Sequence, residues 1–153
     1  MKTFEEYKKE LDEYGKISSI TTESGIYKVH MPQNFELVIT SGTDAIKVHR
    51  GKNLLYPVQK LEEKWESIRL LDKEGILYVG KAKNLRRRIT EFVKYGYEDC
   101  KTHRGGRAIW QLKNNKELLI EIIPCGNPRE KERQLLIEYH DKYGEYPFAN
   151  WQK

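Results

Sequence analysis

The 153-residue chain lacks the sequence features of membrane-spanning, secreted and disulfide-bonded proteins. No apolar run approaches the roughly 18 residues that a membrane-spanning helix needs. Residues 1–15 carry charges throughout instead of the apolar stretch of a signal peptide. Cysteine is limited to Cys100 and Cys125, without the CxxC spacing of a zinc site. We therefore expect a cytoplasmic protein with no membrane partner, no zinc site and no disulfide scaffold.

Internal repeats, low-complexity segments, an interdomain linker and the glycine-rich loop that binds nucleotide phosphates are also absent from the sequence. Hydrophobic residues make up 38% of the chain and charged residues 33%, a balance typical of a globular protein. A chain of this length can bury its own core without disulfides. We therefore expect a single domain that covers residues 1–153.

Positive charge is concentrated between residues 81 and 107, although the net charge of +5 is modest. This range holds nine Lys or Arg residues against three Asp or Glu residues. Such a patch suits a polyanion, because neutralising phosphates and releasing their counterions drives binding to nucleic acid. An ordinary solvated helix face is the alternative, and composition alone leaves both interpretations open.

Hydrophobic periodicity and turn residues predict the secondary structure. Helices are expected at 3–15, 58–71, 85–95, 107–113 and 128–143. Strands are expected at 25–31, 75–80 and 118–123, with a hairpin formed by 35–40 and 45–48. Asn127, Pro128 and Glu130 predict a capping box at the start of the last helix. The predicted fold is α/β (α+β): a small mixed, largely antiparallel sheet of about three core strands flanked by helices, with an inserted subdomain.

Glu132 stands out on the last predicted helix because it falls on the apolar side. It precedes Leu135, Leu136 and Tyr139 by three, four and seven residues, so helical periodicity places it in the same stripe. A carboxylate that faces the core needs a cation, a hydrogen-bond network or a metal to compensate for its lost hydration. We interpret Glu132 as a metal ligand at the floor of a cleft, with pairing to a structural arginine as the alternative.

Five features occur in a fixed order along the chain. They are Gly25-Ile26-Tyr27, Tyr78-Val79-Gly80-Lys81, Arg88 ten residues after the second tyrosine, Glu132 three residues before a Leu-Leu pair, and Pro147-Phe148-Ala149-Asn150. The ordered set resembles the GIY-YIG nuclease family. The resemblance covers residues 25–27 and then most of 75–150.

This resemblance implies a single-domain, phage- or restriction-like endonuclease that hydrolyses phosphodiester bonds in double-stranded DNA. It implies that Arg88 binds a phosphate oxygen, that Glu132 binds Mg²⁺ or Mn²⁺, and that Tyr27 or Tyr78 activates a water. Lys81 is expected to favour the phenolate form of that tyrosine. The residues themselves leave the choice of base open, while similarity to the excision-repair incision nucleases favours Tyr78.

Further contacts to nucleic acid are expected from the basic patch and the closing motif. Several family members carry a tyrosine or histidine four residues after the arginine. Here that position is Phe92, so His103 is the candidate replacement as a base or phosphate contact, with an ordinary surface histidine as the alternative. The predicted nucleic-acid-binding residues are Lys83, Arg86, Arg87, Arg104, Arg107 and Asn150.

The two tyrosine motifs are separated by 50 residues, residues 28 through 77, instead of the usual ten or so. We interpret residues 32–74 as an insertion between the two motif strands, and residues 1–20 as an N-terminal helical extension. The alternative is that Gly25-Ile26-Tyr27 is a coincidence. A hairpin connection accepts an insertion at small entropic expense. We expect the insertion to serve substrate discrimination or formation of a homo-oligomer.

Two other functions compete with the endonuclease. The first is a catalytically inactive nucleic-acid-binding module on the same fold, which Phe92 and the separated motifs favour. The second is a structural protein, or a protein that binds small phosphate compounds, with an ordinary basic face. Steep salt dependence of DNA affinity distinguishes the nucleic-acid binders from the last class, and metal-dependent cleavage distinguishes the enzyme from the inactive module.

Overall fold

A computed structural model describes residues 1–41, 55–97 and 106–151. Over these residues, four strands form one sheet in the order β1-β4-β2-β3, and each neighbouring pair is antiparallel. The strands are β1 (Lys2–Thr3), β2 (Gly25–His30), β3 (Ile76–Ala82) and β4 (Leu119–Pro124). The predicted small α/β fold with about three core strands is therefore confirmed. The additional strand β1 has only two residues, too few for alternation to reveal it.

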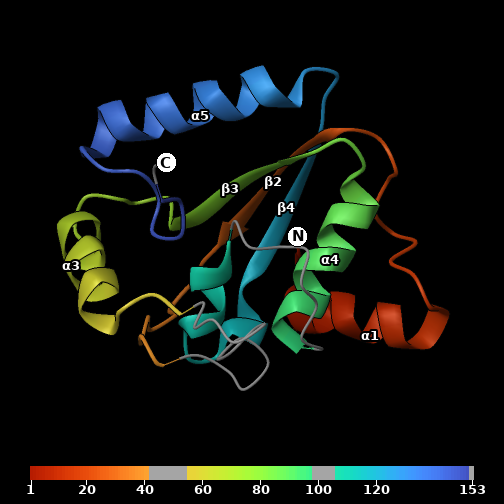
Figure 1. Cartoon of the computed structure of the whole chain (residues 1–153), viewed down its shortest axis with the longest axis horizontal. Coiled ribbons are helices and arrows are strands. Elements are labelled where there is room, and N and C mark those ends of the chain that lie inside the picture. Colours follow the sequence, from red (N-terminus) through yellow and green to blue (C-terminus); the bar gives the residue numbers. More distant parts are fainter. Residues whose placement is uncertain (42–54, 98–105, 152–153) are drawn as a thin grey trace.

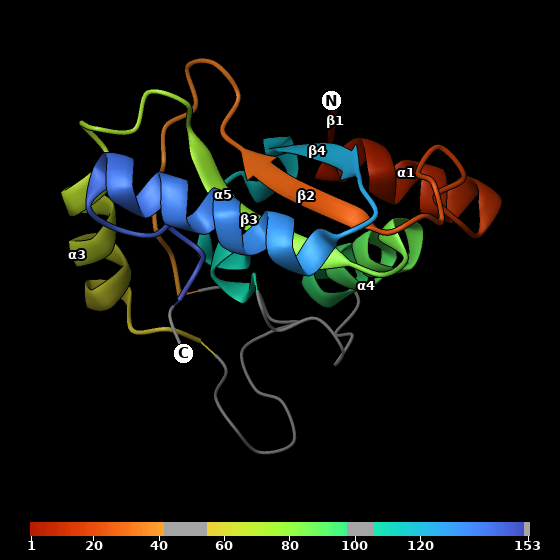
Figure 2. The ribbon, with the colours of Figure 1, turned by 90° about the horizontal axis from the view of Figure 1, so that it is seen from above.

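Helices cover both faces of the sheet, as Figures 1 and 2 show. Helix α5 lies along one face, and α1 and α4 lie on the other, while α3 lies beside the sheet. Two short 3₁₀ helices, η1 and η2, precede β4. The bounds are α1 (Phe4–Tyr14), α3 (Val58–Ile68), α4 (Leu85–Tyr97), η1 (Arg107–Gln111), η2 (Asn115–Glu117) and α5 (Pro128–Tyr143). None of the helices in the described part of the chain has the length and apolar composition needed to cross a membrane.

The core is divided by the sheet, because successive residues of a strand point to opposite faces. Tyr27 of β2 packs with residues of α1 and α4, including Phe4 and Phe92. The preceding residue, Ile26, packs under α5 with Tyr139. Alternation along β2 thus assigns the motif tyrosine to the α4 side of the sheet.

Residues 31–75, called here the β2–β3 connection, join two neighbouring strands and include α3. The predicted helix at 58–71 is confirmed with an earlier end, Ile68. The predicted strand at 35–40 is wrong: among the described residues of this segment, Ile39 alone forms a bridge, with Leu112. Its neighbour Thr40 donates its N–H and its hydroxyl to the carbonyl of Gln111, so this segment is bound to η1. The other half of the predicted hairpin, 45–48, lies outside the described residues.

The helix ends show where capping was and was not readable from the sequence. The predicted end of the first helix at Gly15 is confirmed, and that glycine has a φ of 74°. The predicted capping box of α5 is wrong, because the Asn127 side chain makes no capping hydrogen bond and Glu130 pairs with Arg133 at 3.2 Å. A capping box does occur at the start of α1, where Thr3 is the cap. The Pro128 start and Gly144 end of α5 are confirmed.

Candidate active site

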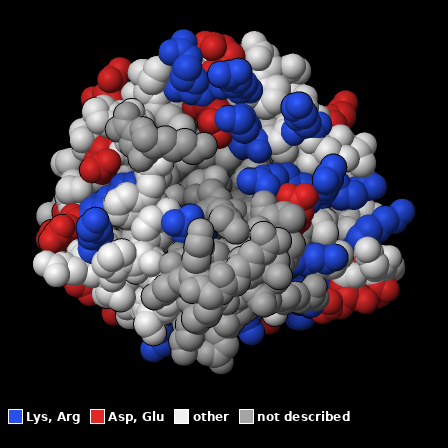
Figure 3. Space-filling view, viewed as in Figure 1, with Lys and Arg blue, Asp and Glu red and all other residues white. Residues whose placement is uncertain are grey.

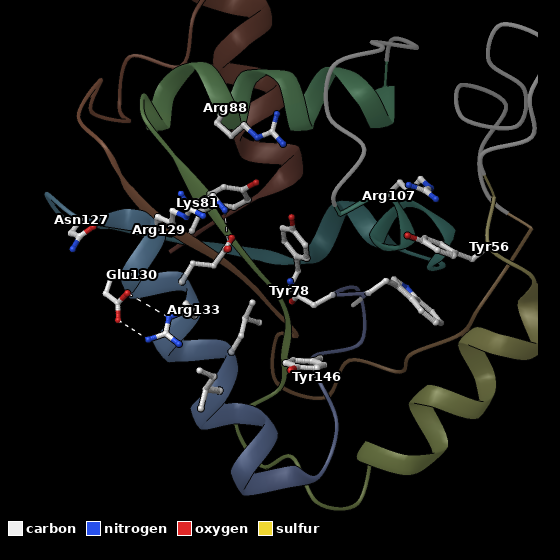
Figure 4. Close-up of a pocket in the computed structure, with 16 residues that line it drawn as sticks. Tyr56, Tyr78, Lys81, Arg88, Arg107, Asn127, Arg129, Glu130, Arg133 and Tyr146 are labelled. Atoms are coloured by element: carbon white, nitrogen blue, oxygen red, sulfur yellow. Dashed lines mark hydrogen bonds and ion pairs between the residues drawn. The ribbon is translucent and has the colours of Figure 1, made fainter. Parts of the chain in front are cut away.

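A cleft of about 1270 Å³ is lined by residues of β3, α4, α5 and the β2–β3 connection, among others. Figure 4 shows its side chains converging from these elements. Seven of the residues singled out from the sequence line it, although they come from distant parts of the chain. They are Tyr27, Tyr78, Lys81, Arg88, Arg107, Glu132 and Asn150.

Tyr27 is held in place by the glycine of the second motif. Tyr27 and Gly80 are directly paired across β2 and β3, and the Tyr27 ring covers the space where Gly80 lacks a side chain. A Cβ atom at Gly80 would lie 2.3 Å from Cζ of Tyr27 and 2.5 Å from its hydroxyl oxygen. Only a glycine fits here without movement, and the ring is 1% exposed. The two halves of the motif therefore form one packing unit.

The hydroxyl groups of Tyr27 and Tyr78 share a hydrogen bond, and Arg88 also bonds to Tyr27. Burial raises the pKa of Tyr27 to about 12, although Arg88 and Tyr78 each oppose the shift. Burial also raises the pKa of Tyr78 well above its usual value, and the neighbouring Tyr27 raises it further. The environment therefore favours ionisation of Tyr27 over Tyr78, because Arg88 acts on Tyr27 through both its charge and a hydrogen bond but on Tyr78 through its charge alone.

Glu132 faces the cleft from α5 and forms an ion pair with Lys81 of β3, with 3.1 Å between Nζ and Oε1. Its side chain is 21% exposed, and Leu135 and Leu136, which follow it on the helix, are half-buried. The compensating cation is thus a lysine, not the arginine considered as an alternative from the sequence. Lys81 was expected to act on a tyrosine, but its ion pair is with the carboxylate, and Arg88 is the cation beside Tyr27.

Arg88 reaches the cleft from the first turn of α4. Asn84 begins this helix, since its Oδ1 accepts the N–H of Arg87 at 3.0 Å. Glu91 lies one turn further and accepts a hydrogen bond from Arg88 at 3.1 Å. Burial and the hydrogen bond to Tyr27 have opposite effects on the pKa of Arg88, and the net shift is upward. Arg88 therefore stays charged at the cleft floor.

Three other basic residues predicted to bind nucleic acid lie on or before α4 but do not line the cleft. Arg86 is tied to the N-terminal segment, because it donates to the carbonyls of Ile20 at 2.8 Å and Ser18 at 3.3 Å. Arg87 is exposed and pairs with Glu91 at 3.2 Å. Lys83 is also exposed. Contacts from these residues to nucleic acid stay predictions, and Arg86 has a structural role that periodicity did not reveal.

Asn150 and Phe92 have structural tasks next to the two tyrosines. The Asn150 amide accepts the N–H of Val79 and donates to its carbonyl, both at 2.9 Å. Phe92 is fully buried, with its ring 6.0 Å from the rings of Tyr27 and Tyr78. The absence of a hydroxyl at this position is therefore explained by packing. The other two predicted residues, 103 and 104 (His103 and Arg104), lie outside the described residues.

The cleft lining offers few carboxylates that could bind a metal ion. No group of three or more His, Cys, Asp or Glu residues suited to a metal ion occurs in residues 1–41, 55–97 and 106–151. Glu132 is the carboxylate beside the tyrosines, and Glu130 is directed to Arg133. Mg²⁺ is often bound by one or two carboxylates together with water and substrate phosphates. One glutamate thus fits an ion whose other ligands come from water and the substrate.

Several residues of the cleft were missed by the sequence reasoning. Arg129 and Arg133 share the Glu132 side of α5, and their spacing of four was a readable signal. Tyr56, Tyr146 and Trp151 lie outside helices and strands, so no periodicity marks them. Figure 3 shows Lys and Arg side chains gathered over α4 and α5 on this face of the molecule. With five basic and two acidic residues in its lining, the cleft is suited to an anionic ligand.

Comparison with known proteins gives a similarity to the UvrABC system protein C from two strains of Porphyromonas gingivalis. Each is 34% identical to this chain over 92 residues, which is 60% of the chain and 14% of the relative. The chain therefore spans about one seventh of the length of these curated relatives. No family model matches the chain, and no solved structure does. The similarity supports the GIY-YIG resemblance at the level of the family.

Proposed function

We propose that the protein is a metal-dependent endonuclease of the GIY-YIG type that hydrolyses phosphodiester bonds in DNA. The observation that carries this proposal is the convergence of Tyr27, Tyr78, Lys81, Arg88 and Glu132, from four different elements, on one basic cleft. Binding of nucleic acid does not require two buried tyrosine hydroxyls beside a half-buried glutamate. Phosphodiester hydrolysis does require a base, a cation for the phosphate and a carboxylate for a metal.

In this mechanism Arg88 binds a non-bridging oxygen of the scissile phosphate. Its guanidinium keeps its charge at any working pH and presents paired donors that match phosphate geometry. Its contact with Glu91 fixes the side chain from the solvent side, and its bond to Tyr27 fixes it from the core side. Arg88 thus orients the phosphate next to the tyrosine pair.

Tyr27 is the base that the electrostatics favour, in contrast to the Tyr78 that the resemblance favours. The Tyr78 hydroxyl and Arg88 both stabilise a Tyr27 phenolate. Glu132 opposes that phenolate by its negative charge, and the ion pair with Lys81 reduces this effect. We therefore assign Tyr27 to proton removal from the attacking water, Tyr78 to hydrogen bonding of its oxygen, and Lys81 to partial neutralisation of Glu132.

Glu132 would hold Mg²⁺ or Mn²⁺, together with water and phosphate oxygens. When bound, such an ion supplies Lewis-acid stabilisation of the phosphate and of the departing oxygen. The residues of the chain supply the other steps. Arg88 binds the phosphate, Tyr27 removes the proton, and Tyr78 orients the Tyr27 oxygen through their hydrogen bond.

A catalytically inactive nucleic-acid-binding module is the second candidate. It is favoured by one observation, the ion pair between Lys81 and Glu132 at 3.1 Å. In that reading, lysine neutralises the glutamate permanently and no metal binds. The basic cleft would still bind the phosphates of DNA.

The deciding experiment is cleavage of plasmid and short duplex DNA by the wild type, Glu132→Gln and Glu130→Gln, with Mg²⁺, with Mn²⁺ and with chelator. Glu130 is the matched control, since it lies two residues away in the lining of the same cleft but pairs with Arg133. We expect metal-dependent cutting by the wild type and Glu130→Gln, and loss of cutting in Glu132→Gln with DNA binding retained. Salt-sensitive DNA binding without cutting by any of the three would favour the inactive module.

A further inference from the structure

Tyr56, Arg107 and Trp151 line the cleft together and are called here the aromatic wall. Figure 4 shows Tyr56 and Arg107 on the side of the cleft opposite α5. The Arg107 guanidinium lies 4.4 Å from the centre of the Tyr56 ring. The Tyr56 ring is stacked on Trp151, with centroids 4.9 Å apart and an interplanar angle of 16°. Lys64 lies 4.5 Å from the other ring in this stack, that of Trp151. The wall is therefore a continuous stack with Arg107 at one end.

The aromatic wall is anchored by two polar side chains, Gln111 and Lys64. Gln111, which is 1% exposed, accepts the N–H of Tyr56 at 2.9 Å and donates to its carbonyl at 3.0 Å. At the other end, Lys64 donates to the carbonyl of Asn150, next to Trp151. Hydrogen bonds to backbone groups thus hold the β2–β3 connection and the chain end together beside the cleft.

An arginine held on a ring has a specific chemistry. Stacking on an aromatic face leaves the donors of the guanidinium in its own plane, where they match the oxygens of a phosphate. The ring attracts the cation without cancelling its charge, as a carboxylate would. Stacking on Tyr56 therefore gives the Arg107 guanidinium a fixed direction at the cleft surface.

We propose that Arg107, positioned by Tyr56, forms a second phosphate-binding subsite of the cleft. This subsite binds a phosphate of the DNA strand other than the one that Arg88 holds, and the inference rests on the proposed nucleic-acid function. The cleft volume of about 1270 Å³ exceeds the roughly 300–1,000 Å³ of sites for single small ligands. It accommodates a strand segment that carries more than one phosphate. Tyr56 is a positioning residue, and the β2–β3 connection contributes it to the site.

Two substitutions separate the charge from its placement. Arg107→Gln removes the cation, and Tyr56→Leu removes the ring but leaves the net charge unchanged. Tyr56→Phe keeps the ring and serves as the conservative variant. Arg69→Gln is the matched control for charge, because Arg69 is exposed, pairs with Glu66 at 2.9 Å and does not line the cleft.

The measurement is the affinity for a short fluorescent DNA duplex in chelator, titrated at several salt concentrations. We expect Arg107→Gln to bind several-fold more weakly and to reduce the slope of log affinity against log salt by about one. Tyr56→Leu should weaken binding in the same direction, while Tyr56→Phe and Arg69→Gln should match the wild type. In cleavage, Arg107→Gln should raise KM and leave kcat nearly unchanged, because the subsite does not touch the scissile phosphate.

Thermal unfolding of each variant identifies any that is misfolded, and Arg107→Gln decides the matter if Tyr56→Leu fails to fold. A wild-type slope in Arg107→Gln would overturn the subsite while leaving the proposed function intact. An equal loss in Arg69→Gln would also overturn it, since the effect would then be general electrostatics. Absence of DNA binding by the wild type would overturn the proposed function and the subsite together.

Discussion

Replacement of Gly80 by alanine tests whether the two tyrosine motifs form one packing unit. The added Cβ would lie 2.3 Å from Cζ of Tyr27 and 2.8 Å from its Cε1, so the ring must move. Overfilling a packed core costs about 1–3 kcal/mol. Gly80 is not among the glycines with positive φ, so alanine recovers about 0.4–1 kcal/mol by restricting the unfolded chain. We expect a net loss of about 1–2 kcal/mol.

Gly80→Ala should also lower the rate of DNA cleavage. A shift of the Tyr27 ring moves its hydroxyl relative to Arg88 and Tyr78, with which it shares hydrogen bonds. Misplacement of a reacting group by about 1 Å can cost about 100-fold in rate. We therefore expect Gly80→Ala to fold, to lose at least about tenfold in cleavage rate, and to melt a few degrees lower, at about 2–4 °C per kcal/mol.

Gly126→Ala is the matched control. A Cβ at Gly126 meets no atom within 4 Å, so this variant undergoes the same chemical change without a clash. Cleavage kinetics, guanidinium denaturation and thermal melting of both variants supply the comparison. If Gly80→Ala matches Gly126→Ala in rate and in unfolding free energy, the packing of the ring against residue 80 does not position the base, and the reasoning is refuted.

Three further predictions concern titration and the edge of the sheet. Because the pKa of Tyr27 is raised to about 12, the cleavage rate should rise about tenfold per pH unit between about pH 7 and 9, and a flat profile would argue against Tyr27 as the base. Burial lowers the pKa of Lys64 to about 8, below the 10.5 of the unfolded chain, so its charge destabilises the fold fully below pH 8 and ceases to do so above about 10.5. Lys64→Met loses this pH-dependent part together with the hydrogen bond to Asn150, so the unfolding free energy of the wild type should increase relative to that of Lys64→Met as pH rises from 8 to 10.5, measured by denaturation at several pH values; a pH-independent difference would contradict this. Asn150→Ala removes both hydrogen bonds to Val79 and should destabilise by about 1–3 kcal/mol with reduced cleavage, measured by denaturation and DNA cutting against wild type; unchanged stability would show that water replaces the amide.

The sequence predicted the fold best where local pattern and packing agree. The strand at Gly25–His30 and the helix Pro128–Tyr143 carry strong local signals, an apolar run in one and a Pro start with a Gly end in the other. Arg86 shows the limit of such signals. Its helix was expected, but its hydrogen bonds go to residues 18 and 20, whose position depends on tertiary packing.

The candidate site was predictable in its centre and not at its rim. Tyr27, Arg88 and Glu132 were identified because their spacing matches an ordered motif. Tyr56 and Trp151 come from segments without regular structure, which Gln111 and Lys64 bind through hydrogen bonds to their backbone. No property of either ring in the sequence distinguishes it from an ordinary surface aromatic. The contribution of the β2–β3 connection to the cleft is therefore visible only in three dimensions.

The strand order explains why the closing motif belongs to this site. β3 is the outer strand of the described sheet, so its outer side needs hydrogen-bond partners that no neighbouring strand supplies. Ala149 donates its N–H to the carbonyl of Leu77 at 2.8 Å, and the Asn150 amide pairs with both backbone groups of Val79. The closing segment thus covers the edge on either side of Tyr78. An asparagine is suited to this task because its amide presents an N–H donor beside a carbonyl acceptor, as a peptide strand does. The closing motif thus binds the strand that carries Tyr78, and its place in the ordered set follows from the open edge of β3 beside the candidate site.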